Sequence, residues 1–346
     1  MPDDAGARLV SAVGAEDEQQ FEVGLRPRRL ADFTGQARLK ENLQIAIDAA
    51  RKRGEAMDHV LLYGPPGLGK TTLASIIAQE LDVHFTQTSG PVLQKKLDLS
   101  GILSGIQHRQ VFFIDEIHRL LPDVEEMLYS ALEDFHLDIL IGTGPGARTH
   151  SIPLQKFTAI GATTRQGLVS APMRGRFGLV LRLNHYDVAE LKLIVERSAK
   201  LLETPIDDDG AEEIARRARG TPRIANRLLR RVRDYAQVRA KGHITRAVAV
   251  TALNLLEVDP FGLDEIDQKI MQTVLEKFGG GPVGVNTIAA SIGEEPETIE
   301  EVYEPYLIQL GFLHRTPRGR IATERAFEYF KVAKRFGGVV GQPELF

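Results

Sequence analysis

The stretch Gly64-Pro-Pro-Gly-Leu-Gly-Lys70-Thr71 decides the fold of this 346-residue chain. It stands between an apolar run at residues 59–63 and a run at residues 72–81 whose apolar side chains recur with helical spacing. A strand, a glycine-rich loop and a helix in this order form a phosphate-binding loop, whose backbone N–H groups point at the phosphates of a nucleotide. The sequence therefore predicts that the chain binds a nucleoside triphosphate.

The individual residues of this loop predict a metal as well as a nucleotide. In loops of this type the lysine, here Lys70, neutralises phosphate charge, and the hydroxyl of the next residue, here Thr71, ligates Mg²⁺. The chain therefore needs a carboxylate beside the loop to complete the metal site.

Two more apolar runs end in polar side chains that suit this chemistry. The run at residues 111–114 is followed by Asp115 and Glu116, and the run at residues 157–162 is followed by Thr163. Because the carboxyl ends of neighbouring parallel strands meet at one edge of a sheet, we expect these side chains beside the phosphate loop. Asp115 then suits Mg²⁺, Glu116 suits an attacking water, and Thr163 suits the γ-phosphate or that water.

Composition excludes several other classes of chemistry. The chain has no cysteine and no tryptophan, which removes disulfides, thiol catalysis and zinc modules built on cysteine. The formal net charge of -4 gives no global sign of nucleic-acid binding, so such a site must come from local clustering. Without an apolar stretch long enough to span a bilayer, we expect a cytoplasmic protein that does not contact a membrane.

The pattern of apolar runs divides the chain into a tail and three domains. We expect a flexible tail at 1–20, an α/β nucleotide-binding domain at 21–183 with a parallel sheet, a small all-helical domain at 184–256, and a winged-helix domain at 257–346.

The last domain combines a helix-turn-helix pattern with a short β-ribbon, which is typical of winged helices that contact DNA or other proteins. Its helix at 296–310 carries several glutamates that repel phosphates, so groove insertion by this helix is disfavoured. The ribbon instead offers Arg315, Arg318 and Arg320 around a Thr-Pro turn with no acid among them. We therefore predict that DNA is contacted by these arginines of the wing.

Two arginines outside these motifs are candidates for phosphate contacts. Arg176, late in the α/β domain, provides a rigid cationic fork that can reach a nucleotide on a neighbouring subunit; a solvated arginine is the alternative. Arg223 follows Pro222 at the positive end of a helix dipole, where a cation is unfavourable unless an anion is near. Either a γ-phosphate or a carboxylate satisfies Arg223.

A hairpin and a basic helix complete the candidates. The hairpin at 137–154 is inserted between two predicted sheet strands, and its apolar side chains either form a docking surface or pack on their own domain; they are Ile139, Leu140 and Ile141. The helix that begins at Pro222 is rich in arginine, which suits a subunit interface, DNA or solvent.

Taken in order, the phosphate loop, Asp115-Glu116, Thr163, Arg176 and Arg223, followed by a helical lid, resemble the AAA+ ATPases. Longer stretches are similar to the motors of bacterial Holliday junction branch migration within that family, and these stretches cover nearly the whole chain beyond the tail. They are 114–120, 160–165, 219–233, 280–284 and 315–320.

This resemblance implies a homohexameric ring that uses ATP and Mg²⁺ to move the duplex arms of a Holliday junction. It also implies loading by RuvA through the hairpin at 137–154, and the resolvase RuvC as a further partner. Thr163 and Arg223 would sense the nucleotide, and Arg176 would act on the ATP of the next subunit. The remaining implied nucleotide contacts are Leu25, Arg26, Gly64, Gly67, Gly69, Thr72, Tyr186 and, near the subunit interface, Glu133, Asp134 and Phe135.

Two positions depart from the family pattern, and two other classes of function are alternatives. Gly175 stands where an aspartate is usual, and Pro296 stands where a basic residue can face DNA. A clamp-loader or initiator-like ATP switch is one alternative, which the absent cysteines and the wing disfavour. A protein unfoldase is the other, and the region 90–110 lacks the aromatic pore residue which that class requires.

Overall fold

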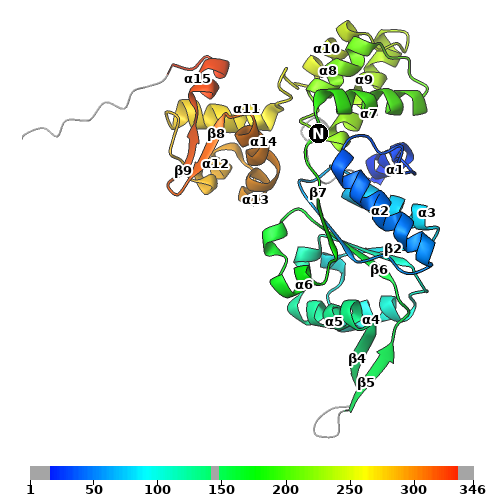
Figure 1. Cartoon of the computed structure of the whole chain (residues 1–346). Helices are drawn as coiled ribbons and strands as arrows, with labels where there is room; N and C mark the ends of the chain where they lie inside the picture. Colours follow the sequence, from blue (N-terminus) through cyan, green and yellow to red (C-terminus); the bar gives the residue numbers. More distant parts are fainter. Residues whose placement is uncertain (1–15, 142–147, 334–346) are drawn as a thin grey trace, which may run out of the picture. The chain divides into compact units, whose positions relative to one another are not determined.

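The computed structural model describes residues 16–141 and 148–333, with side chains for residues 21–138 and 150–333 (Figure 1). Two compact units account for the chain. Within the described residues, one comprises 16–141, 148–203 and 220–226, and the other comprises 204–219 and 227–333. Residues 220–226 thus belong to the first unit, although 204–219 before them and the chain after them belong to the second.

The first unit is built on a parallel five-stranded sheet in the order β2-β3-β6-β1-β7. The strands are β1 (Val60–Tyr63), β2 (Phe85–Ser89), β3 (Val111–Asp115), β6 (Thr158–Thr163) and β7 (Leu179–Arg182). Since β3, β6 and β1 are adjacent, the ends of β3 and β6 lie beside the loop that follows β1. The predicted α/β class and the clustering of these strand ends are confirmed.

Helices cover both faces of this sheet. Figure 1 shows α2 (Ala37–Arg53) and α3 (Lys70–Leu81) on one side, and α4 (Lys96–Ser104) and α5 (Pro122–Glu133) on the other. Helices α4 and α5 pack against the sheet through an apolar cluster that contains Phe112 and Ile114 of β3 together with Leu99, Leu103 and Leu128. Alternate residues of β3 thus face opposite helical layers, which explains why the strand reads as a continuous apolar run.

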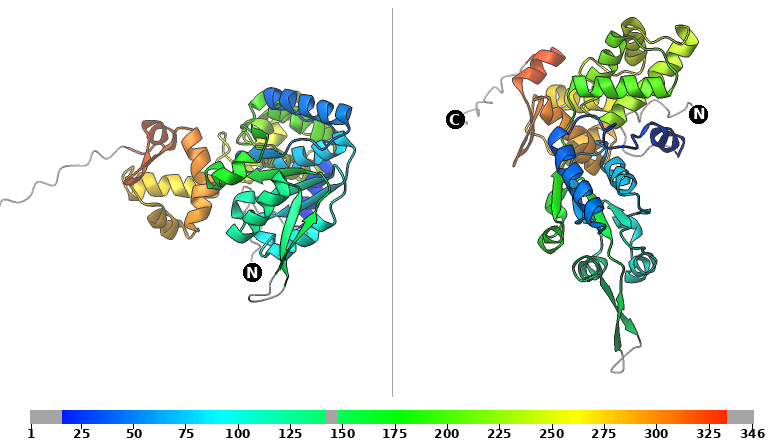
Figure 2. Two further views of the ribbon diagram at one scale, coloured as in Figure 1. Left: turned by 60° about the horizontal axis from the view of Figure 1, so that its bottom comes forward. Right: turned by 45° about the vertical axis from the view of Figure 1, so that its right-hand side comes forward.

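A two-stranded hairpin projects from the unit, as predicted. It consists of β4 (His136–Ile141) and β5 (Arg148–Pro153), paired antiparallel, and it extends away from the sheet in both views of Figure 2. The backbone of Ile139, Leu140 and Ile141 belongs to β4, but their side chains lie outside the described residues.

Two more helical regions belong to this unit. Helix α1 (Glu16–Leu25) begins inside the segment 1–20 that was expected to be a flexible tail, and residues 1–15 lie outside the described residues. Helix α7 (Val188–Leu201) starts with a capping box: Asp187 Oδ1 accepts from Glu190 N at 2.7 Å, and Glu190 Oε2 accepts from Asp187 N at 3.1 Å.

The second unit contains most of the helical lid and the winged helix. Helices α8 (Asp208–Arg216), α9 (Pro222–Arg239, whose first turn belongs to the first unit) and α10 (Arg246–Leu255) are followed by α11 (Glu265–Gln272), η5 (Thr273–Lys277) and α12 (Val285–Ile292). The helix predicted at 296–310 is made of α13 (Pro296–Thr298), η6 (Ile299–Tyr303) and α14 (Glu304–Gln309). The ribbon is β8 (Leu313–Thr316) and β9 (Gly319–Ala322), and α15 (Glu324–Phe330) follows.

Candidate functional site

One pocket of the first unit gathers most of the predicted nucleotide residues. It is lined by α1 and the segment after it, the phosphate loop, the ends of β3 and β6, helix α7 and the first turn of α9. All of these segments belong to the same compact unit. The predicted residues that line it are Leu25, Arg26, Gly67, Gly69, Lys70, Thr71, Thr72, Asp115, Glu116, Tyr186 and Arg223.

Glycines of the phosphate loop leave room only for backbone. Gly64 has φ +147, and a Cβ there would lie 2.5 Å from the carbonyl oxygen of Leu183. A Cβ on Gly67, with φ +76, would lie 2.7 Å from Cγ2 of Thr221. Both the positive φ and the close neighbours therefore require glycine at these two positions.

Lys70 is held against the loop in which it lies. Its side chain is buried, and Nζ donates to the carbonyl oxygens of Gly64 at 2.8 Å and Pro65 at 2.9 Å. Burial lowers the pKa of Lys70, while the carboxylates of Glu116 and Asp115 raise it. An ammonium at this point of the pocket is suited to an anionic ligand.

The residues predicted to hold Mg²⁺ face each other. Thr71 Oγ1 lies 3.4 Å from Asp115 Oδ2, and the other carboxylate oxygen, Oδ1, accepts from the backbone N–H of Glu116 at 3.0 Å. Glu116 itself has φ 46 and ψ 48, a left-handed conformation that is uncommon for a residue with a side chain. This backbone turn directs the strand end into the pocket, as strained residues at functional sites often do.

The structure separates the two hydroxyls at the end of β6. Thr163 is completely buried and does not line the pocket; its Oγ1 lies 2.9 Å from His118 Nδ1 and accepts from Arg165 N at 2.9 Å. Its neighbour Thr164 does line the pocket and donates to Glu116 Oε2 at 3.3 Å. The geometry therefore favours Thr164 over the predicted Thr163 as the hydroxyl that meets a ligand.

A histidine that sequence reasoning missed links these groups. His118 Nδ1 lies 3.2 Å from Glu116 Oε2 as well as 2.9 Å from Thr163 Oγ1. Burial lowers the pKa of His118, although the nearby Glu116 opposes this shift. Neutral imidazole can therefore hold both side chains in place without adding a charge to the pocket.

Arg223 lines the pocket with a carboxylate already beside it. Its Nε donates to both oxygens of Glu22, at 3.1 and 3.0 Å, and its backbone N–H donates to the carbonyl oxygen of Gly67 at 3.4 Å. Glu22 comes from α1, the helix that begins in the predicted tail. The predicted anion next to Arg223 is thus a carboxylate in this structure. Sequence reasoning missed Glu22, which lies 201 positions from Arg223 in the chain.

Arg176 does not line this pocket. Its Nη2 pairs with Glu133 Oε2 at 2.6 Å, and its guanidinium carbon lies 4.5 Å from the ring centroid of Tyr129. Asp134 and Phe135 follow Glu133 in the chain, and the ring of Phe135 packs edge-on against Phe157. A Cβ at Gly175 would have no heavy atom within 4 Å, so the structure has room at this position for the aspartate that is usual in the family.

The structure corrects one of the DNA contacts predicted for the wing, that of Arg320. Arg320 is only 7% exposed and donates to Glu304 Oε2 from Nε and Nη2, at 2.9 and 2.7 Å, and to Glu300 Oε1 at 2.6 Å. Such a buried ion pair is part of the domain core and does not offer its charge to a phosphate. Arg315 remains 60% exposed although it lies 3.2 Å from Glu300, and Arg318 is exposed at the turn.

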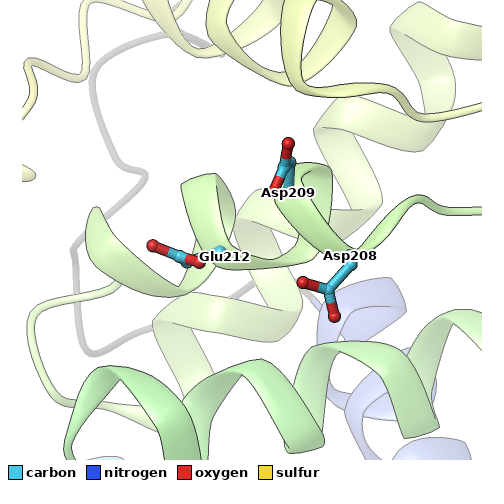
Figure 3. Close-up of side chains that lie close together, drawn as sticks. All are labelled: Asp208, Asp209 and Glu212. Carbon is cyan, nitrogen blue, oxygen red and sulfur yellow. The ribbon is translucent and has the colours of Figure 1, made fainter.

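An acidic cluster lies at the start of α8 (Figure 3). One carboxylate oxygen from each of three residues lies within 4.8 Å of the other two, and the residues are Asp208, Asp209 and Glu212. Carboxylates in the first turn of a helix are stabilised by the helix dipole, and Glu212 also pairs with Arg216 at 2.6 Å. These roles account for the cluster without a ligand.

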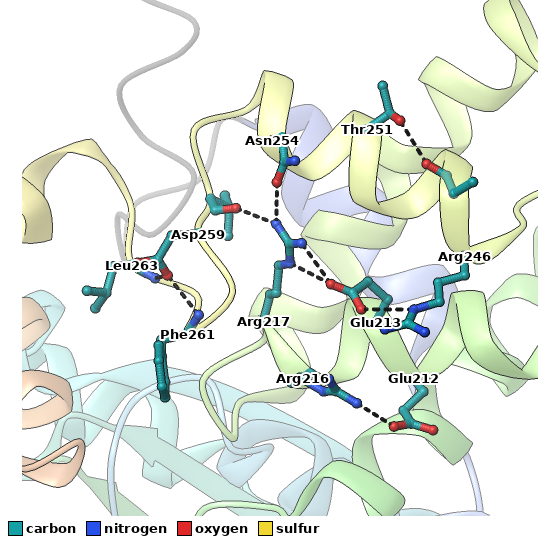
Figure 4. A network of polar contacts seen from close by, with 12 residues as sticks. Glu212, Glu213, Arg216, Arg217, Arg246, Thr251, Asn254, Asp259, Phe261 and Leu263 are labelled. Carbon is teal, nitrogen blue, oxygen red and sulfur yellow. Dashed lines mark hydrogen bonds and ion pairs between the residues drawn. The ribbon is translucent and has the colours of Figure 1, made fainter. Parts of the chain in front are cut away.

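Arg217 joins α8 to the chain that leads into the winged helix (Figure 4). The guanidinium donates to Glu213 Oε1 from Nε and Nη2, at 2.9 and 2.7 Å, and from Nη1 to Asn254 Oδ1 at 2.8 Å and the carbonyl oxygen of Val258 at 2.7 Å. Arginine and glutamate are both buried, so this network fixes the end of α10 rather than a ligand.

Comparison with known proteins adds a family to this geometry. Residues 25–183 match the model of the Holliday junction DNA helicase RuvB P-loop domain, 186–259 match the RuvB AAA lid domain, and 260–331 match the RuvB C-terminal winged helix domain. The chain belongs to the RuvB family. It is therefore an AAA+ ATPase and a motor of Holliday junction branch migration, with a DNA-binding winged helix.

Individual RuvB proteins are similar over almost the full length. The Holliday junction branch migration complex subunit RuvB of Solibacter usitatus is 78% identical over 335 residues, which cover 97% of this chain and 96% of that protein. The corresponding subunit of Koribacter versatilis is 63% identical, over 95% of this chain and 91% of its own. The RuvB motor of Thermotoga maritima matches in structure with a TM-score of 0.82 and 52% identity, covering 90% of this chain and 99% of its own.

These RuvB matches decide against a clamp-loader, an initiator-like switch or an unfoldase. Within the described ranges 16–141 and 148–333, no helix is both long and apolar enough to cross a membrane.

Proposed function

We propose that this chain binds ATP with Mg²⁺ in the pocket of its first unit, and that hydrolysis there drives a homohexameric ring along the duplex arms of a Holliday junction. RuvA loads the ring at the junction, and RuvC is a further partner. The observation that carries the proposal is the convergence of Lys70, Thr71, Asp115, Glu116 and Arg223 on one pocket.

The residues of the pocket fit both ligands. Gly67 and Gly69 of the phosphate loop line the pocket, loops of this type bind phosphates through their backbone N–H groups, and Lys70 adds a buried cation. Thr71 and Asp115 offer the hard oxygen ligands that Mg²⁺ prefers, at a distance at which one ion can contact both. When bound, Mg²⁺ would neutralise charge that develops on the phosphates.

The carboxylate of Glu116 would accept a proton from the attacking water, because it is the second acid of the site and is not directed at Thr71. Thr164, 3.3 Å from this carboxylate, would orient the same water or the γ-phosphate. His118 and Thr163 would hold Glu116 and the strand end in place from behind. Arg223 would exchange its contact with Glu22 for one with the γ-phosphate.

Arg176 would complete the site of a neighbouring subunit. It does not line the pocket of its own chain, yet it presents a guanidinium that is one-quarter exposed on the same unit. A fixed arginine that reaches an adjoining nucleotide stabilises the charge of phosphoryl transfer, typically by about 10³ to 10⁵ in rate. Glu133, Asp134 and Phe135 would lie at the same interface.

On the DNA side, Arg315 and Arg318 of the wing would contact backbone phosphates. The hairpin of β4 and β5 would bind RuvA with the apolar residues Ile139, Leu140 and Ile141. Its projection from the sheet supports this part of the proposal, because a partner can reach both of its strands.

ATP hydrolysis by defined variants tests the site. Lys70→Ala should abolish ATP binding, whereas Glu116→Gln should bind ATP as the wild type does and fail to hydrolyse it. The control Glu41→Gln changes an exposed carboxylate of α2 and should leave both properties unchanged. Full hydrolysis by Glu116→Gln would contradict the assigned role, and full binding by Lys70→Ala would contradict the site.

A further inference from the structure

The short helix α6 (Ala171–Gly175) connects the two ends of one contact network around Arg176. Ser170 begins the helix as its N-cap, with Oγ accepting from Met173 N at 3.2 Å, and Arg176 ends it as the C-cap residue. Each end of α6 contacts the same side chain of α5, that of Tyr129.

Tyr129 contacts Arg176 with its ring and with its backbone. The guanidinium carbon lies 4.5 Å from the ring centroid, and Arg176 Nε donates to the carbonyl oxygen of Tyr129 at 3.4 Å. This distance is well inside the range in which an aromatic face attracts a cation. The ring therefore forms a surface under the planar group of Arg176.

The ring of Tyr129 is itself fixed at its far end. Its hydroxyl donates to Glu125 Oε1 at 2.5 Å and lies 3.0 Å from Ser170 Oγ, which also donates to Glu125 Oε1. Burial and the bond to Glu125 raise the pKa of Tyr129, so the hydroxyl keeps its proton and remains a donor. The hydroxyl contacts to Glu125 and Ser170 thus fix the position of the Tyr129 ring, on which the guanidinium of Arg176 lies.

Two other contacts engage the terminal nitrogens of Arg176. Nη1 donates to the carbonyl oxygen of Pro172 at 2.8 Å within the same helix, and Nη2 pairs with Glu133, whose side chain is 59% exposed. A neighbouring nucleotide can replace an exposed carboxylate, because salt and water weaken such a pair. The aromatic contact leaves the edge of the guanidinium available to a phosphate.

We propose that Tyr129 is a positioning residue for Arg176, which sets the direction of its guanidinium toward the nucleotide of the next subunit. This inference rests on the proposed role of Arg176 in a neighbouring site. Tyr129 touches no reacting group; it acts through the arginine, and the hydroxyl contacts to Glu125 and Ser170 determine where its ring lies.

The first test compares steady-state ATP hydrolysis of assembled rings. Tyr129→Leu should lower kcat by about ten- to a hundredfold, the effect of misplacing a catalytic group by about 1 Å, and should leave KM for ATP within about twofold. Tyr129→Phe, which keeps the ring and loses the anchor, should fall between this variant and the wild type. Met127→Leu, a volume-conserving change on the same helix, serves as the control and should behave as the wild type.

Two further measurements separate positioning from a merely structural role. In an Arg176→Ala background, Tyr129→Leu should lower kcat no further, because its effect passes through the missing arginine. In mixed rings, Tyr129→Leu subunits should recover hydrolysis when combined with Lys70→Ala subunits, which lack a working pocket and keep an intact Arg176. If Tyr129→Leu does not fold, Tyr129→Met fills the same space with a flexible apolar chain and makes the same predictions.

The outcomes distinguish this inference from the proposed function. Recovery by Arg176→Ala with Lys70→Ala, but not by Tyr129→Leu with Lys70→Ala, would overturn the role of Tyr129 alone. A wild-type kcat for Tyr129→Leu would do the same. Failure of the Arg176→Ala mixture to recover would instead contradict the action of Arg176 between subunits.

Discussion

The contact between Arg223 and Glu22 makes a quantitative prediction about ATP affinity. Both oxygens of Glu22 lie 3.0 to 3.1 Å from Arg223 Nε, and the Glu22 side chain is only 12% exposed. If Arg223 binds the γ-phosphate, this pair must first be broken or shared. Glu22→Gln removes the negative charge and keeps the size of the side chain, so it should strengthen ATP binding.

The expected size of the effect follows from the exposure of the two side chains. Hydrogen bonds to charged groups contribute about 1.5 to 3 kcal/mol when buried, and exposed ion pairs contribute about 0.2 to 1 kcal/mol. Since Arg223 is 32% exposed, a value near 1 kcal/mol is appropriate. That free energy corresponds to ATP binding about fivefold tighter in Glu22→Gln.

Titration of a fluorescent ATP analogue in the presence of Mg²⁺ measures this affinity, with the ADP analogue titrated in parallel. The gain should be larger for ATP, because the proposed contact of Arg223 is with the γ-phosphate. Glu41→Gln provides a control for the loss of one negative charge from the first unit. Unchanged or weaker ATP binding, or an equal gain for ADP, would refute the reasoning.

Three other predictions concern the wing, the end of β6 and a buried histidine. Arg320→Met should destabilise the winged helix by about 3 to 5 kcal/mol, because it removes the buried partner of Glu304. Arg318→Ala should instead leave thermal unfolding nearly unchanged and weaken DNA binding. Equal losses of stability in the two variants would contradict this distinction. Thr164→Val should lower kcat for ATP more than Thr163→Val does in the same hydrolysis assay, and the reverse order would restore the prediction made from sequence. Burial lowers the pKa of His59, whose Nδ1 accepts from Ala159 N at 2.9 Å. The stability that His59 contributes is therefore present above about pH 6.5 and is lost as the pH falls below that value. In urea unfolding at several pH values, the free energy of unfolding of His59→Gln should depend less on acid than that of the wild type, and an unchanged dependence would exclude this role.

Local signals were sufficient to predict the parallel sheet domain and the phosphate loop. The loop residues from Gly64 to Thr71 are adjacent in the chain, and their conformation depends mainly on the glycines and on the strand and helix that flank them. Asp115 was predictable for a related reason, since the carboxyl ends of parallel strands gather at one edge of the sheet.

The choice between Thr163 and Thr164 depended on a detail that sequence does not carry. Successive residues of a strand point to opposite sides, so a shift of one position at the strand end reverses which hydroxyl faces the pocket. All residues of β6 are buried, and an apolar run of this kind contains no alternation that marks the two faces.

The contacts of two arginines were not predictable, because their partners are distant in the chain. Arg320 was assigned to DNA, and the partner of Arg223 was left as either a γ-phosphate or a carboxylate. No acid stands near Arg320 in the ribbon, yet Glu300 and Glu304 reach it from the preceding helix. Arg223 meets Glu22 across 201 positions of sequence. Long-range pairing of this kind follows from how elements pack, which residue order alone does not determine.

Movement of a synthetic four-way junction tests the central claim most directly. The wild-type chain, mixed with RuvA and Mg²⁺, should convert the junction to its branch-migrated products with ATP and should fail to do so with a non-hydrolysable ATP analogue or with Lys70→Ala in its place. Migration at the wild-type rate by Lys70→Ala, or with the analogue, would contradict the claim that hydrolysis in this pocket moves DNA.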